Sequence, residues 1–173
     1  LTRSSAASDV YKRQILNSVI ISGGAVLVSL IIGIPAGYIL ARSNFKFKED
    51  IGFFILGFRF APLILVIIPM FYFFTILGIK DTYFGMIWVY QVITLPMIIW
   101  LTRVYVEDIP IELEEAAFVD GASVLHVIYK IILPLLRPGL VGASLLVFLL
   151  AWHNFALGLF CLLYTSDAAD DRV

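Results

Sequence analysis

Charged residues and the side chains that usually carry catalysis are scarce in this chain. Asp, Glu, Lys and Arg make up 14% of its 173 residues, against about 25% in typical soluble proteins. The single cysteine excludes an internal disulfide, and two histidines with one cysteine give no metal-ligand set at a recognisable spacing. No Ser/His/Asp constellation, glycine-rich phosphate loop or Cys-x-x-Cys pair occurs. We therefore expect a chain that is not an enzyme and that binds no cofactor or metal itself.

Apolar side chains, in contrast, are in large excess. They make up 61% of the chain, against about 45–50% in typical soluble proteins, and the mean hydropathy is +1.00. A soluble domain of this size would have too little polar surface to dissolve. The formal net charge is −1 and the basic residues are scattered, so nothing indicates nucleic-acid binding. We predict an all-α fold, a polytopic transmembrane helical bundle in contact with membrane lipid.

The apolar residues fall into runs that can cross a bilayer, because roughly 20 apolar residues at about 1.5 Å each span the hydrocarbon core. We expect four spans, over residues 15–40, 51–77, 84–101 and 139–160. Glycines inside the first run are more typical of close helix packing than of a binding site.

The longest amphipathic interval covers residues 109–140 and begins at a proline. Pro110 can open a helix at its first turn, where the missing N–H costs nothing. Acidic residues then lie near the positive end of the helix dipole, at Glu112, Glu114 and Glu115. Small and apolar residues three or four apart share one face, which alanine leaves flat enough for another backbone to approach; they are Leu113, Ala116 and Ala117.

The middle of this interval predicts a turn and a second helix. Gly121 can adopt positive φ and end the first helix, and either Asp120 or Ser123 can accept from free N–H groups at the start of the next. We expect Pro134 and Pro138 to close that second helix. The result is a helix–turn–helix loop between the third and fourth spans, over about residues 103–138, which we call the coupling loop.

The distribution of cations in the short connections predicts the orientation. The connection after the first span carries Arg42, Lys46 and Lys48. The coupling loop carries Arg103, Lys130 and Arg137. Because the turn between the second and third spans has Lys80 alone, the positive-inside rule places the first connection and the coupling loop in the cytoplasm.

The residues of the coupling loop resemble a known family. Glu115-Ala116-Ala117, three residues, Gly121, nine residues and then Ile131-x-Leu133-Pro134 are similar to the EAA loop of permease subunits of binding-protein-dependent ABC importers. The resemblance implies the following ATPase-coupling residues: Glu114, Glu115, Ala116, Ala117, Asp120, Gly121, Ile131, Leu133 and Pro134. It also implies a prokaryotic plasma (inner) membrane location, cytoplasmic ABC ATPase subunits that bind ATP and Mg, a second permease subunit and an extracytoplasmic solute-binding protein.

Shorter segments resemble the carbohydrate-importer branch of that family. They are the residues at 17–18, 36–46, 58–62 and 77–82, whereas His153 departs from the usual pattern around Trp152. The resemblance implies a permease subunit that forms a translocation path for a sugar or sugar-related solute. Two alternatives stay open: a permease for amino acids, peptides or another small solute, and a non-transporting membrane protein whose amphipathic helix pair lies in the interface.

Polar residues within the predicted spans are candidates for the translocation path. Arg59 lies eight residues into the second span, where insertion costs about 2.5–3.5 kcal/mol unless the charge meets water or a partner. Three interpretations stay open: Arg59 faces the path or an ion-pair partner, it snorkels to the interface, or the true span begins nearer Phe58. Gln91 and Thr94 either hydrogen-bond to other helices or line the path. Asn154 in the fourth span completes this set.

The two ends of the sequence are interpreted separately. Residues 1–14 and 161–173 resemble translated sequencing-adapter sequence, so we expect both to be non-native and residues 15–160 to form the permease domain. Members of the resembled branch typically have six spans. The resemblance therefore implies a fragment that lacks one span before residue 15 and one after the fourth.

Overall fold

The computed structural model describes the backbone of residues 2–58, 63–79 and 82–170, and side chains chiefly over residues 15–58, 72–79 and 82–153. In the described ranges the chain consists of helices joined by short turns, with no strand. The all-α prediction is confirmed. Three of its helices or helix segments are long and apolar enough to cross a membrane: Ile15–Arg42, Tyr83–Glu107 and Val124–His153.

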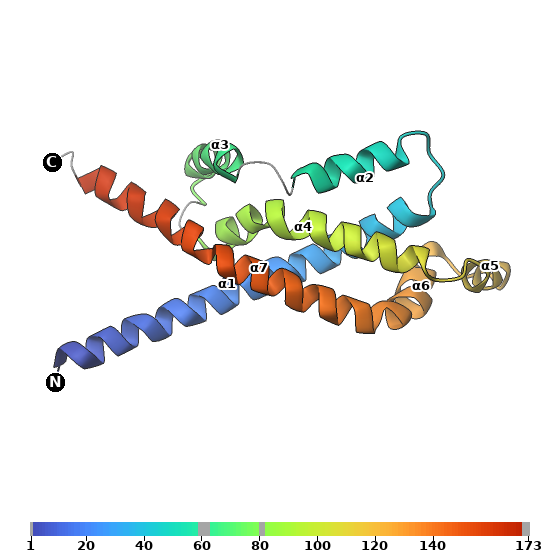
Figure 1. Cartoon of the computed structure of the whole chain (residues 1–173), viewed down its shortest axis with the longest axis horizontal. Coiled ribbons are helices and arrows are strands. Elements are labelled where there is room, and N and C mark those ends of the chain that lie inside the picture. The colour runs from blue at the N-terminus through green and yellow to red at the C-terminus, as the bar shows by residue number, and fades with distance from the viewer. Residues whose placement is uncertain (1, 59–62, 80–81, 171–173) are drawn as a thin grey trace.

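The three long helices pack against one another and form the body of the molecule. They are α1 (Thr2–Arg42), α4 (Tyr83–Glu107) and α7 (Leu133–Asp170). Figure 1 shows the C-terminal ends of α1 and α4 meeting the start of α7 at one end of the bundle, beside the short helices α5 (Glu112–Val119) and α6 (Val124–Val127). The coupling loop therefore lies at the end of the bundle where all three long helices converge.

Glycines allow α1 and α4 to approach closely. A Cβ added at Gly33 would lie 2.7 Å from Cγ2 of Ile98. One added at Gly37 would lie 2.7 Å from Cβ of Thr102 and 2.8 Å from the carbonyl oxygen of Ile99. Neither position can hold a larger residue without separating the helices, so the prediction that these glycines serve packing is confirmed here.

The region predicted as a single span, residues 51–77, contains two described helices, α2 (Lys48–Gly57) and α3 (Leu63–Ile76), of 10 and 14 residues. At 1.5 Å per residue these are roughly 15 and 21 Å long, short of the ~30 Å hydrocarbon core. The described residues thus contain three candidate spans instead of the four expected.

The prediction that Pro134 and Pro138 close the second helix of the coupling loop is wrong. α6 continues through a π-helical turn, η2 (Ile128–Ile132), directly into α7, and both prolines lie inside helix. The Leu133 N–H donates to the carbonyl of Ile128, five residues back. This wider turn immediately before Pro134 accommodates a ring that would press on the preceding carbonyl in a regular α-helix. The coupling loop is consequently continuous with the third candidate span.

A buried apolar cluster fastens the coupling loop to the long helices. We call it the junction cluster; its buried members are Tyr38, Ala41, Val106, Val127, Ile128, Ile132, Leu136 and Leu140. They come from α1, α4, α6, η2 and α7, and Val106, Val127 and Ile132 are 0% exposed. Because one cluster contains side chains from all of these elements, the base of the loop and the ends of the long helices share a single packed core.

Candidate functional site: the coupling loop

The first helix of the coupling loop begins as the sequence predicts. α5 starts at Glu112, two residues after Pro110, and its first turn contains Glu112, Glu114 and Glu115. The carbonyl of Pro110 accepts from the Leu113 N–H at 3.4 Å. Three carboxylates in one turn match the positive end of the helix dipole, so the acidic start of this helix is confirmed.

The turn after α5 has the hydrogen bonds of a Schellman motif. Gly121 has φ +83°, its N–H donates to the Phe118 carbonyl at 3.0 Å, and the Ala122 N–H donates to the Ala117 carbonyl at 2.9 Å. The predicted positive φ is confirmed. Ser123 Oγ accepts from the His126 N–H at 3.3 Å, so Ser123 caps the second helix, while Asp120 is the C-cap of α5. The turn is thus fixed by its own backbone.

Glu114 lies inside the chain, on neither a solvated face nor a surface open to another subunit. It is 2% exposed, and the Tyr38 hydroxyl donates to Oε2 at 2.7 Å. Arg42 Nε donates to Oε1 at 2.7 Å and Arg42 Nη2 donates to the Ile109 carbonyl at 2.7 Å. Both carboxylate oxygens of Glu114 are therefore engaged within the chain.

Glu115 and the tip of the loop face outward. Glu115, Ala116 and Asp120 are exposed, and Val119 is 87% exposed. Large apolar side chains surround them, namely Leu113, Phe118 and Leu125, each at least 41% exposed. Of the two alanines, Ala117 is half-buried against the junction cluster, so Ala116 is the one that presents a flat surface. An acidic group beside an apolar tip is a surface suited to a protein partner.

The motif residues after the turn divide between the interior and the surface. Ile131 and Leu133 are half-buried and pack against the junction cluster, whereas Pro134 is exposed. Ile131 and Leu133 therefore hold the second helix of the loop in place from within. Their spacing in the motif is explained here by packing.

The polar residues proposed for the translocation path join α1 to α4. Gln91 Nε2 donates to the carbonyls of Ala25 at 3.1 Å and Ile87 at 3.0 Å. Ser29 Oγ lies 2.7 Å from both Gln91 Oε1 and Thr94 Oγ1. Of the two alternatives for Gln91 (6% exposed) and Thr94 (0% exposed), the structure thus shows hydrogen bonding between helices. Arg59 and the side chain of Asn154 lie outside the described residues.

A second ion-pair site, built on a buried arginine, was missed by sequence reasoning, which counted Arg103 only as a cation of the loop. Arg103 is 6% exposed, its Nε donates to Glu107 at 2.8 Å, and its Nη2 donates to Glu49 of α2 at 2.6 Å. Its guanidinium lies 5.5 Å from the ring centroid of Trp100. The four-residue spacing of Arg103 and Glu107 was an available signal. Nothing in the sequence indicated Glu49.

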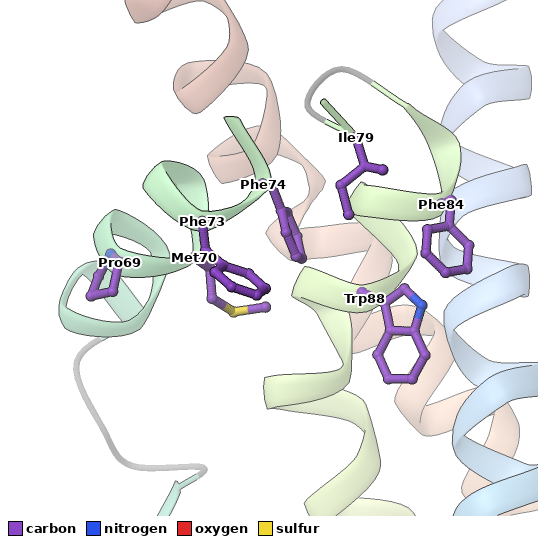
Figure 2. Close-up of a pocket in the computed structure, with 7 residues that line it drawn as sticks. All are labelled: Pro69, Met70, Phe73, Phe74, Ile79, Phe84 and Trp88. Atoms are coloured by element: carbon purple, nitrogen blue, oxygen red, sulfur yellow. The ribbon is translucent and has the colours of Figure 1, made fainter. Parts of the chain in front are cut away.

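An open apolar pocket of about 620 Å³ lies between α3 and α4 (Figure 2). Its lining is Pro69, Met70, Phe73, Phe74, Ile79, Phe84 and Trp88. The indole N–H is the one side-chain hydrogen-bond donor among these residues. A polyhydroxylated solute needs several such groups, so this pocket does not have the chemistry of a sugar site.

The fold and the loop define a helical inner-membrane component of a transport system. Residues 33–166 match the family described as "Binding-protein-dependent transport system inner membrane component". The match covers more than half of the chain, and the chain belongs to this family. It is a membrane-embedded protein.

Curated relatives include transport permeases named for sugars. The chain is 37% identical over 151 residues to the trehalose/maltose transport system permease protein MalG of Thermococcus litoralis, covering 87% of this chain and 53% of that protein. It is 33% identical over 151 residues to the trehalose transport system permease protein SugB of Mycobacterium tuberculosis, covering 87% and 55%. The chain therefore spans about half the length of the curated relatives it matches.

A solved structure supports the same fold. The chain is similar to a bacterial ABC transporter described as involved in the import of the acidic polysaccharide alginate, with a TM-score of 0.65 and 30% sequence identity. The similarity covers 79% of this chain and 48% of that one. The prediction of an ABC importer permease fold is confirmed.

Proposed function

We propose that this chain is part of a permease subunit of an ATP-driven importer and forms part of the translocation path for a sugar or sugar-related solute. The relatives named for trehalose and maltose support the solute class. ATP and Mg would be bound by a separate cytoplasmic ATPase subunit. The remaining partners are a second permease subunit and an extracytoplasmic solute-binding protein, in a prokaryotic inner membrane.

The observation that carries this proposal is the apolar, outward-facing tip of the coupling loop. Val119 is 87% exposed and Leu125 is 64% exposed, at the end of the bundle where α1, α4 and α7 meet (Figure 1). A tip of this kind is stabilised when a partner covers it. Ala116 lets the partner's backbone approach closely, and Glu115 is placed to pair with a basic residue of the ATPase.

The continuity of the loop with α7 supports a mechanical role. Because α6, η2 and α7 follow one another without a break, a rigid displacement of the tip is carried into the third candidate span. Closure of an ATPase dimer would then rotate the bundle and switch the solute path between its inward and outward openings. Two groups of cations favour a cytoplasmic position for the loop. One follows the first candidate span, and the other lies in the coupling loop itself.

The test is co-purification of the subunit, assembled in the membrane, with its cognate ATPase. In Ala116→Trp a bulky ring occupies the flat surface of the tip, and we expect loss of ATPase co-purification together with loss of ATP-dependent uptake. Asn44→Trp is the matched control, because Asn44 is exposed at the same end of the bundle but outside the loop. Full co-purification and uptake by the Ala116 variant would contradict the docking role.

A further inference from the structure

Glu114 ties the coupling loop to the end of the first candidate span. Tyr38 and Arg42 belong to the last turn of α1, and both donate to the Glu114 carboxylate, which is 72 to 76 positions away in the sequence. Arg42 also donates to the carbonyl of Ile109, just before α5. These three hydrogen bonds, which we call the tie, hold α5 and the segment leading into it against α1.

The burial of this site makes the tie stiff. Glu114 has a side-chain exposure of 3% and Arg42 one of 17%, so water competes little for their hydrogen bonds. Tyr38 is 5% exposed and is itself a member of the junction cluster. A buried ion pair tolerates loss of one partner poorly, because the remaining charge is left without compensation. Displacing α5 away from α1 would therefore break an ion pair and expose the edge of a packed core.

Adjacent glutamates have separate tasks in this arrangement. Successive residues of a helix point about 100° apart, so when Glu114 faces α1 its neighbour Glu115 faces outward. Glu115 is exposed, and its carboxylate is open to a partner. One turn of α5 can thus contact a partner on one side and α1 on the other.

We propose that Glu114 is a positioning residue that transmits displacement of the coupling loop to α1 through Tyr38 and Arg42. Without this tie, motion of α5 would reach α1 only through apolar contacts of the junction cluster and through α4 and α7, to which the loop is joined along the chain. With it, all three candidate spans move together. The source of the displacement rests on the function proposed above, whereas the tie is a property of this chain alone.

The tie is tested first without any partner. Double electron–electron resonance measures the distance between two spin labels on the solubilised full chain. Spin labels are placed at Ile39 of α1 and Val119 of α5, both exposed, in a Cys161→Ser background. We expect one narrow distance distribution in the parent and a broader or shifted one in Glu114→Ala. Glu112→Ala is the matched control, because it removes an exposed carboxylate from the same helical turn and should leave the distribution narrow. An unchanged distribution in Glu114→Ala overturns the proposal.

A milder pair of variants guards against loss of folding in Glu114→Ala. Tyr38→Phe keeps the ring in the junction cluster and removes one hydrogen bond, and Arg42→Gln removes the charge from the other partner. Each should broaden the distribution less than Glu114→Ala does. If both variants match the parent, the proposal fails.

The second measurement uses the assembled transporter and follows uptake per ATP hydrolysed. We expect Glu114→Ala to retain its ATPase subunits but to lower this ratio by roughly 2- to 30-fold, the range seen for residues along a coupling path. A ratio equal to that of Glu112→Ala overturns the transmission role. If the parent chain binds no ATPase, the proposed function fails, and the distance measurement still decides the tie.

Discussion

Arg103 Nη2 lies 2.6 Å from Glu49 Oε1 and thereby joins the buried face of α4 to the first turn of α2. The two residues differ sharply in environment, since the side chain of Arg103 is 7% exposed and that of Glu49 is 62% exposed. A Cβ added at Gly52 would lie 2.6 Å from Arg103 Nη1, so a glycine makes room for the guanidinium. The ion pair and the close contact at Gly52 thus both lie between α2 and α4.

This asymmetry predicts unequal effects of removing the two partners. Glu49→Ala removes an exposed carboxylate and should lower the free energy of unfolding by less than about 1 kcal/mol. Arg103→Ala removes a buried side chain together with its contact on Trp100, and should cost about 1–3 kcal/mol. Thermal unfolding in detergent measures both. Equal losses would show that the arginine contributes only through its pair with Glu49.

Glycine substitutions test the close approach of α1 and α4. Gly37→Ala places a methyl group against Thr102 and the backbone of Ile99, and should destabilise the bundle by about 1–3 kcal/mol. Gly23→Ala is the matched control in the same helix, because nothing lies within 4 Å of its added Cβ. Alanine is a better helix former, so the control should be neutral or stabilising by up to ~1 kcal/mol. A Gly37 variant as stable as the control would refute the tight contact.

The positive φ at Gly121 is tested by replacing the glycine with residues that have a Cβ. Nothing lies within 4 Å of a Cβ added there, so any cost of Gly121→Ala comes from its φ of +83° and should be about 1–2 kcal/mol. Gly121→Asn should cost less, since asparagine tolerates this region better. Hydrogen exchange of the Gly121 and Ala122 amides, which close the turn, reports the loss locally. Equal exchange in all three proteins would argue against a strained turn.

Local rules predicted the turn but not the direction of the glutamates. The start of α5 and the positive φ of Gly121 follow from proline, acidic residues and glycine within one short segment. Whether Glu114 or Glu115 faces inward depends on Arg42, which is 72 positions away in the sequence, and no pattern in α5 reveals it. Arg42 was counted as a loop cation because its role requires the packed end of α1.

Neither a hydrophobic run nor a proline shows by itself where the backbone stays helical. Residues 51–77 read as one hydrophobic run, and their described part contains two helices, α2 and α3. Pro134 and Pro138 were interpreted as helix ends, and that prediction is wrong. There, the π-helical turn η2 lets the helix continue, and a turn of this kind has no clear signature in the sequence.

The polar contacts between α1 and α4 distinguish a structural role of Gln91 from a role in solute binding. Gln91 has both amide protons on backbone carbonyls and its oxygen 2.7 Å from Ser29 Oγ, so it has no free donor for a solute. We expect Ser29→Ala to destabilise the bundle by about 0.6 kcal/mol, the average for interhelical hydrogen bonds in membranes. Ser144→Ala is the control, because the Ser144 hydroxyl donates within its own helix.

In the assembled transporter, Gln91→Leu should lower the amount of folded protein while the solute concentration for half-maximal uptake stays unchanged. A changed half-maximal concentration with normal protein levels would instead place Gln91 on the translocation path.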